Sequence, residues 1–425
     1  MINNAEHMDS GWMDPNLTHH NIHLDGGLEA FRTTDPHLRR LYQQKLIFKS
    51  SLLEKPPQNM PGIYSLTGAR QIGKTTLLKQ WMEKLMSGGL SPSQFLFLTG
   101  EVIDDHHALV RIVSEVTNPK ETNKIFYLVI DEVTYIKDWD KGIKFLADSG
   151  QLENTVLILC GSDLSLIKEA RKRFPGRRGK SECLDFHLFP LSFNEAVGLK
   201  QKQLDLESDH FIDLLFDEFQ QYLQHGGFLT AMNELSKENT ITQGTFATYS
   251  DWIRGDLLKR GKQETYLREI FFGIIKNYGC QMSWNALSKH LSIDHPMTVA
   301  SYVDLLSHMD VLLVQQPLME DKLKGAPKKA KKIFFTDPFI YHAIFHWLYP
   351  QKNPFENNVQ SALTNPTLLG SLVESVVVLS SKDLKQVLKY KNAKIWGQVR
   401  EKSSVHHVEV EPLPLALWRL TGENP

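Results

Sequence analysis

Between residues 63 and 160, the most hydrophobic segments are short runs of consecutive apolar residues. Four apolar, β-branched runs occupy residues 63–67, 95–98, 125–130 and 155–160, and amphipathic stretches separate them. Because each run is apolar on both faces, it fits a strand of a parallel sheet that is covered by helices. The pattern from residue 63 to about residue 191 therefore predicts an α/β nucleotide domain.

The pattern becomes helical after Ser192. The clearest predicted helices are residues 211–223, 249–260 and 266–278. Further on, residues 284–291 and 297–309 predict two helices joined by a turn, and extended runs follow at 311–315 and 332–335. This layout is typical of a winged helix-turn-helix, although many such units bind protein or only pack internally.

The two ends of the chain show weaker patterns. Residues 1–34 have no clear period and predict a loosely ordered arm, whereas apolar positions from Asp35 to Leu52 approximate a helical stripe. A helix at 371–380 and a strand at 393–396 predict a short third unit. We therefore expect four parts, with boundaries at 1–34, 35–195, 196–345 and 346–425.

His19, His20 and His23 lie in the predicted arm. Three close histidines can bind a metal, but neither a carboxylate nor a cysteine completes a known ligand spacing. A solvated arm is therefore the favoured interpretation.

Charge and cysteine content narrow the classes of function. The 425 residues include 48 Lys plus Arg and 49 Asp plus Glu, so the net charge of −1 gives no general attraction to nucleic acid or anionic membrane. The three cysteines are widely separated, which supports neither a disulfide framework nor a zinc site. The cysteine pattern indicates a reducing cytoplasm. Since the longest apolar runs fall far short of the ~20 residues of a spanning helix and the first thirty residues are polar, we expect neither a membrane span nor a secretory signal.

A phosphate-binding loop is predicted directly after the first strand. The sequence from Gly68 to Thr75 has two glycines, four residues apart, followed by Lys and Thr. Such glycines let successive backbone N–H groups face phosphate oxygens, while Lys74 reaches the β- and γ-phosphates and Thr75 binds Mg²⁺. The alternative is an ordinary strand-to-helix turn. The predicted ATP contacts are Gly68, Ala69, Arg70, Gln71, Ile72, Gly73, Lys74, Thr75 and Thr76.

An acidic pair completes this pattern. The apolar run 125–130 ends in Asp131 and Glu132. Asp131 is predicted to bind Mg²⁺ and Glu132 to act as the general base towards water. An acidic pair at a strand end can also be a solvated turn.

Three further residues are candidates for sensing or stabilising the γ-phosphate. Ser162 follows the run 155–160, and Arg177 and Arg178 lie on a predicted turn. An arginine from the same chain or from a neighbour can stabilise transition-state charge. The alternative for Ser162 is a hydroxyl that only hydrogen-bonds locally at the strand end. The alternative for the two arginines is an exposed basic loop.

These motifs together resemble bacterial and archaeal ATPases of the AAA type. The resemblance rests on residues 67–78, on 128–132 with Tyr135 and Trp139, on 160–162, and on 175–179 leading to 189–193. It implies that Glu132 is the hydrolytic base and that residues 283–335 form a winged helix, followed by the strand that ends at Asp337. It also implies a C-terminal domain of unknown function.

That last domain is similar to restriction-endonuclease folds, in which a helix Glu precedes acidic residues on strands. Glu374 matches the helix position and residues 395–396 the first strand. Glu409 and Glu411 do not reproduce the usual acidic strand, so a degenerate or truncated domain is favoured over an active nuclease.

A lysine-rich loop lies between the two predicted wing strands. It contains Lys322, Lys324, Lys328, Lys329, Lys331 and Lys332. Lysines on a wing can neutralise DNA phosphates without specifying sequence, whereas the alternative is a solvated loop. The helix at 297–309 offers Thr298, Ser301 and His308 but no Arg or Lys, so base-specific recognition is not favoured.

The expected fold is an α/β P-loop NTPase domain with a parallel sheet and helices on both faces. A helical, winged-helix domain and a small α/β C-terminal domain are expected to follow. The expected function is that of a Mg²⁺-dependent ATPase, a nucleotide-driven switch that engages DNA, a protein partner or further copies of itself. The alternatives are a non-hydrolysing ATP-binding scaffold and an ATP-gated nuclease.

Overall fold

The computed structural model describes residues 15–56, 58–116, 124–162, 174, 176, 178–201, 210–289, 291–293, 295–319, 324–325 and 329–380. The chain divides into two compact units, residues 1–189 and 190–425. The boundary expected near residue 345, between the helical domain and the nuclease-like domain, stays a prediction. The strand expected at 393–396 lies outside the described residues.

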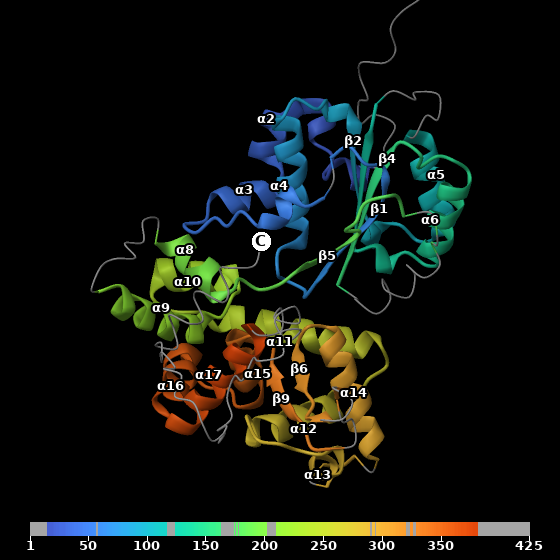
Figure 1. The fold of residues 1–425 in the computed structure, drawn as a ribbon. Helices are drawn as coiled ribbons and strands as arrows, with labels where there is room; N and C mark the ends of the chain where they lie inside the picture. The colour runs from blue at the N-terminus through green and yellow to red at the C-terminus, as the bar shows by residue number, and fades with distance from the viewer. Residues whose placement is uncertain are drawn as a thin grey trace, which may run out of the picture. The chain divides into compact units, whose positions relative to one another are not determined.

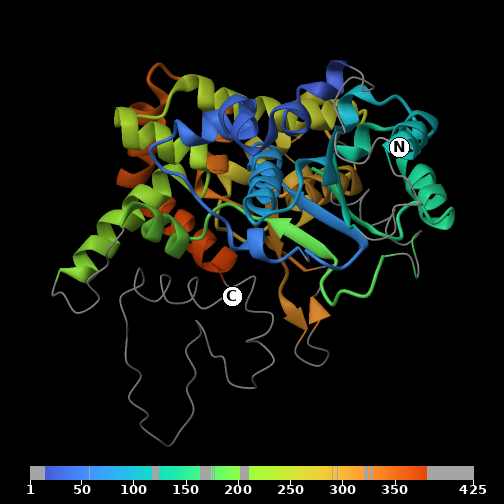
Figure 2. The ribbon, with the colours of Figure 1, turned by 90° about the horizontal axis from the view of Figure 1, so that it is seen from above.

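A five-stranded parallel sheet forms the centre of the first unit, in the order β2-β3-β4-β1-β5. Its strands are β1 (Gly62–Gly68), β2 (Phe95–Thr99), β3 (Phe126–Asp131), β4 (Thr155–Gly161) and β5 (Asp185–Leu188). The first four confirm the strands predicted from the sequence, whereas β5 was not predicted. Figure 2 shows β5 in green beside β1 in blue, and the two strands pair in parallel.

Helices cover both faces of this sheet. The helices α2 (His23–Thr34), α3 (Pro36–Tyr42) and α4 (Lys74–Ser87) lie on one side, and α5 (His106–Val116) and α6 (Trp139–Asp148) lie on the other (Figure 1). Successive residues of β3 pack into two hydrophobic cores, one on each face of the sheet. Tyr127 and Val129 pack towards α4, and Leu128 and Ile130 pack towards α5 and α6. This alternation confirms the prediction of strands that are buried on both faces.

The expectation of a loosely ordered, solvated arm is wrong for residues 15–34. Helix α1 (Pro15–Thr18) and α2 lie here, and Asn21 and His23 are fully buried. The Asn21 side chain accepts from Phe97 N and donates to Phe97 O, both at 2.7 Å, and His23 Nε2 lies 3.1 Å from Phe95 O. Because β2 is an edge strand, these side chains satisfy backbone groups that would otherwise lie exposed at the edge.

A buried ion pair fastens the same segment to α4. Lys79 Nζ lies 3.1 Å from Asp35 Oδ2, both side chains are inaccessible, and Lys79 Nζ also donates to His20 O at 2.6 Å. Phe97 packs its ring 3.9 Å from Lys79 Nζ. Asp35 is the N-cap of α3 and accepts from Leu38 N, and the helix then ends at Tyr42 rather than continuing along the predicted stripe to Leu52.

The second unit is mainly helical. Its helices are α8 (Phe193–Lys200), α9 (Phe211–His225), α10 (Leu229–Glu238), α11 (Gln243–Lys259), α12 (Glu264–Lys276), α13 (Trp284–Ser288), α14 (Pro296–His308), α15 (Pro338–Leu348), η6 (Phe355–Gln360), α16 (Ser361–Thr364) and α17 (Pro366–Ser380). Two short antiparallel pairs accompany them, β6 (Leu312–Gln315) with β9 (Lys332–Phe335) and β7 (Leu318–Met319) with β8 (Lys324–Gly325).

Asp337 holds the start of α15 to the turn after α9. Its carboxyl oxygens accept from Phe339 N and Gly227 N, both at 2.7 Å, and the side chain is buried. Gly227 has no room for a side chain, because a Cβ would lie 2.2 Å from Leu191 O. The turn therefore depends on both the glycine and the aspartate.

Across the described ranges, no single helix is long and apolar enough to span a membrane. The bent pair Phe355–Thr364 and Pro366–Ser380, with a 90° break, meets that length and composition test together.

Candidate nucleotide site

The predicted phosphate loop lies between the carboxyl end of β1 and the start of α4. Gly68, Gln71 and Gly73 have positive φ values of 154°, 59° and 103°. A Cβ on Gly68 would lie 2.5 Å from Leu188 O, so only glycine fits where β1 leaves the sheet beside β5. The chain therefore curls as a phosphate loop does, and it turns directly into a 14-residue helix.

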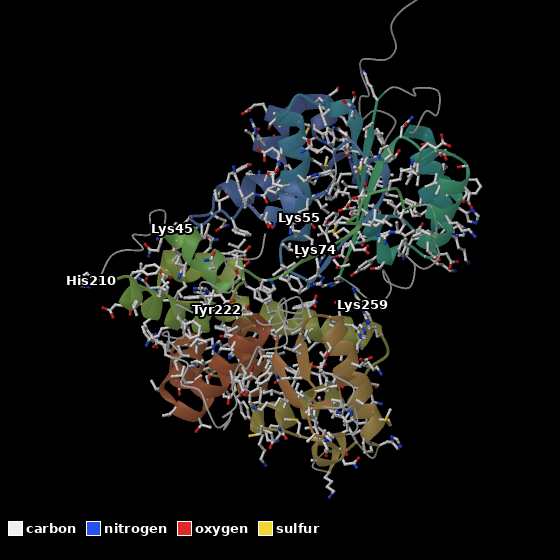
Figure 3. All side chains as sticks on the ribbon, in the orientation of Figure 1. Lys45, Lys55, Lys74, His210, Tyr222 and Lys259 are labelled. Carbon is white, nitrogen blue, oxygen red and sulfur yellow. The ribbon has the colours of Figure 1, made fainter. Side chains whose placement is uncertain are left out.

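Lys74 is the first residue of α4 and is labelled in Figure 3. Its side chain is 5% exposed, and Nζ donates to Gly68 O at 3.1 Å and to Ala69 O at 3.0 Å. The ammonium group is thus held inside the curl of the loop by two backbone carbonyl oxygens.

The strand order brings the other predicted residues to this loop. Strand β4 lies between β1 and β3, with Gly161 opposite Thr67 and Leu159 opposite Ile130. Since the strands are parallel, their carboxyl ends meet at one edge. Asp131, at the end of β3, and Glu132 and Ser162, directly after β3 and β4, therefore lie at the same edge as the phosphate loop.

Thr75 and Asp131, the two residues predicted to bind Mg²⁺, lie in contact with each other. Thr75 Oγ1 donates to Asp131 Oδ2 at 2.5 Å, and Asp131 is 5% exposed. A hydroxyl and a carboxylate are suitable donors for Mg²⁺, which prefers oxygen ligands and commonly shares its sphere with water and substrate phosphates. Among the residues that the structure describes, no group of three His, Cys, Asp or Glu side chains could hold a metal.

Glu132 stands next to this pair in a constrained conformation. Its φ of 49° is left-handed, and its amide donates to Asp131 Oδ1 at 3.1 Å. Burial raises the pKa of the Glu132 carboxyl, while Lys74 counteracts this rise. Ser162 Oγ donates to Glu132 Oε2 at 3.5 Å, so the predicted sensor and the predicted base are neighbours.

Gly100, at the end of β2, was not singled out from the sequence. A Cβ at this position would lie 2.4 Å from the Glu132 carbonyl oxygen and 3.2 Å from Ile136 Cγ1. The backbone that carries Glu132 therefore rests directly on Gly100. No motif marked this glycine, because the contact joins two segments that are distant in sequence.

The structure does not bring Arg178 to the phosphate loop. Its guanidinium pairs with Asp185 and donates to Leu184 O at 3.0 Å, and its backbone oxygen accepts from Ile63 N at 3.2 Å. These contacts lie at the amino end of the seven-residue β1, about 20 Å from the loop at the other end. A role for Arg178 in its own chain's site is therefore wrong, and a role in a neighbouring copy stays a prediction. Arg177 lies outside the described residues.

The lysine-rich loop also differs from its prediction. Lys331 is 3% exposed with Nζ 4.2 Å from the centre of the Trp284 ring, and Lys332 pairs with Glu374 at 2.5 Å. Lys331 is therefore buried instead of facing solvent as expected, whereas Lys332 is partly exposed and paired with an acidic side chain. Lys329 is exposed, while the side chains of Lys322, Lys324 and Lys328 are outside the described part.

Family comparisons agree with this architecture. Residues 61–197 match the model of an AAA domain, and residues 216–350 match a domain of unknown function. The AAA match covers the parallel sheet and the phosphate loop of the first unit, which agrees with the predicted α/β P-loop fold class and supports that part of the resemblance. The match to the domain of unknown function covers most of the helical region and ends at residue 350, so it lies almost entirely before the expected C-terminal domain at 346–425.

Two curated relatives are themselves uncharacterized. A protein from Haemophilus influenzae is 26% identical over 285 residues, covering 64% of this chain and 66% of that protein. A protein from Methanocaldococcus jannaschii is 24% identical over 251 residues, covering 55% and 51%. The chain therefore spans less than two thirds of each relative's length.

Solved structures of similar fold include a Walker-type ATPase from Pyrococcus abyssi, with a TM-score of 0.46, 14% identity, and coverage of 70% of this chain and 96% of that chain. The Aeropyrum pernix Orc1 protein, solved in complex with DNA, has a TM-score of 0.35, 11% identity, and coverage of 80% and 97%. Similarities of this size transfer neither a substrate nor a partner.

Proposed function

We propose that this protein binds ATP with Mg²⁺ and hydrolyses it. The observation that supports this most strongly is the contact of Thr75 with Asp131 at 2.5 Å, directly beside Glu132. A loop that only held phosphate would need Lys74 and the backbone amides. Buried Asp131 and half-buried Glu132, at the carboxyl end of β3, instead fit a site that holds a metal and moves a proton.

The chain's own groups have separable roles in this reaction. Lys74 neutralises the β- and γ-phosphates, and Thr75 and Asp131 would hold Mg²⁺, which supplies charge neutralisation to the phosphate oxygens. Glu132 accepts a proton from water while the water oxygen bonds to the γ-phosphorus. The bond from that phosphorus to the β–γ bridging oxygen breaks, and ADP leaves with the electron pair.

The raised pKa of Glu132 suits a general base. A carboxylate whose pKa is closer to neutrality takes a proton more readily than a fully solvated one. The Ser162 hydroxyl lies 3.5 Å from Glu132 Oε2, which supports the proposal that Ser162 senses the γ-phosphate beside the base.

Phosphate release by the purified chain tests the proposal. We expect turnover of ATP that requires Mg²⁺ and stops when the metal is chelated. ATP binding without turnover would favour the non-hydrolysing scaffold, and absence of binding would refute the proposal.

We further infer that the second unit acts as the partner-engaging part of a nucleotide-driven switch. The succession of α12, α13 and α14 with the β6–β9 pair has the connectivity of a winged helix. The exposed positions of α14 include Met297, which is 64% exposed, Ser301 and Asp304, and the helix has no Arg or Lys. These features favour a protein partner over DNA.

The nuclease alternative receives no support from the described residues. Glu374, which the resemblance placed in a metal site, is paired with Lys332. The other acidic positions of that hypothesis lie outside the described part of the chain.

A further inference from the structure

Arg70 reaches from the phosphate loop to the segment that follows Glu132. Its guanidinium donates a hydrogen bond to the Tyr135 hydroxyl and lies 5.7 Å from the centre of the Tyr135 ring. Tyr135 is 39% exposed, so this contact lies at the mouth of the site rather than in a core.

Tyr135 is tied closely to the proposed base. Its amide donates to Glu132 O at 3.0 Å, and the short 3-10 helix Val133–Tyr135 begins directly after Glu132. The positive charge of Arg70 acts on the Glu132 carboxyl and favours its ionised form. The Arg70 guanidinium therefore lies on the side of the phosphate loop that faces Glu132 and Tyr135.

Lys74 alone leaves part of the developing charge uncompensated. The γ-phosphoryl group spreads its charge over three equatorial oxygens in the transition state. Lysine acts on these oxygens as a point charge, whereas a guanidinium can offer two parallel donors. Arg178, which the sequence predicts for this role, is held at the opposite end of β1.

We propose that Arg70 is a catalytic arginine supplied by the chain's own phosphate loop. It exchanges the Tyr135 hydroxyl for an oxygen of the γ-phosphate when ATP is present, and it returns to Tyr135 after phosphate leaves. Arg70 remains a hydrogen-bond donor throughout and changes no covalent bond. This inference rests on the proposed ATPase function.

The test compares Arg70→Gln and Arg70→Lys with wild type, and uses Arg39→Gln, an exposed position on α3, as the matched control. The readouts are the affinities for ATP and ADP and the turnover per chain at several protein concentrations. We expect Arg70→Gln to lower kcat by roughly 100-fold or more and to weaken ATP more than ADP. Arg70→Lys should recover part of the loss, and turnover per wild-type chain should not rise with protein concentration.

Different results overturn different claims. Wild-type protein that binds no nucleotide would overturn both the proposed function and this inference. Active wild type with an Arg70→Gln variant of equal kcat and equal ATP-to-ADP preference would overturn the inference alone. ADP binding that stays within about threefold of wild type would show that the variant loop is folded, so that loss of turnover reports on the γ-phosphate.

Discussion

Thr75 on α4 donates a 2.5 Å hydrogen bond to Asp131 at the end of β3, although 56 positions separate the two residues. The bond connects the segment after β1 with the end of β3, although β4 lies between these two strands in the sheet. It places a hydroxyl, a carboxylate and the neighbouring Glu132 around one point at the edge of the sheet. The following predictions depend on this arrangement.

Replacing Lys74 by Ala is expected to weaken ATP binding by at least 100-fold. The ammonium is buried in the loop and offers the compact charge that opposes the β- and γ-phosphates. Isothermal titration with ATP measures the loss, and circular dichroism checks that the variant is folded. A folded variant with wild-type affinity would refute the phosphate-loop assignment.

Gly100→Ala is expected to lower kcat by about 10- to 100-fold with little change in ATP affinity. The added methyl group would press on the Glu132 carbonyl, from which it would lie 2.4 Å, and would displace the base. Gly198→Ala is the matched control, because a Cβ there meets nothing within 4 Å. Equal kcat in both variants would mean that the Glu132 segment tolerates this displacement.

The first unit is expected to lose stability as the pH falls from 6.5 towards 4. Burial lowers the pKa of His23 from 6.5 to about 4, so the unfolded chain binds more protons than the folded one in this window. The contribution of His23 is complete above pH 6.5, and its loss amounts to at most about 3 kcal/mol.

Urea unfolding at pH 7.5, 6 and 5 measures this dependence. His23→Gln keeps a donor for Phe95 O but cannot be protonated, and should therefore flatten the pH dependence. An identical pH dependence in the variant would mean that His23 is not buried against β2.

Lys331→Ala is expected to destabilise the second unit by about 1–2 kcal/mol, whereas Lys329→Ala should change its stability by less than about 0.5 kcal/mol. Lys331 packs on the Trp284 ring, while Lys329 is exposed. Thermal unfolding followed by tryptophan fluorescence separates the two. If Lys329→Ala were the more destabilising, the internal role of Lys331 would be wrong.

The sequence predicts the centre of the first unit well, because strands buried on both faces leave short runs of consecutive apolar residues and the phosphate loop has fixed glycine spacing. It does not predict β5, since Asp185–Leu188 has four residues that include Asp and His. The sequence also does not predict the packing of residues 15–34. Asn21 and His23 are polar residues typical of exposed segments, and only the folded structure shows that backbone groups of β2 are their hydrogen-bond partners.

The position of Arg178 illustrates a second limit. Two arginines on a glycine-containing turn fit both a phosphate contact and a structural pair, and only the register of β1 with β5 decides between them. In the same way, Arg70 was assigned to the loop from its motif, but its contact with Tyr135 depends on the folded path after β3.

Phosphate release by Glu132→Gln at saturating ATP tests the account most directly. The amide preserves the shape of the side chain but cannot accept a proton from water. We expect ATP affinity within about threefold of wild type and turnover reduced by at least 100-fold. Wild-type turnover in this variant, with ATP bound, would contradict the proposal that Glu132 is the base of an ATP hydrolase.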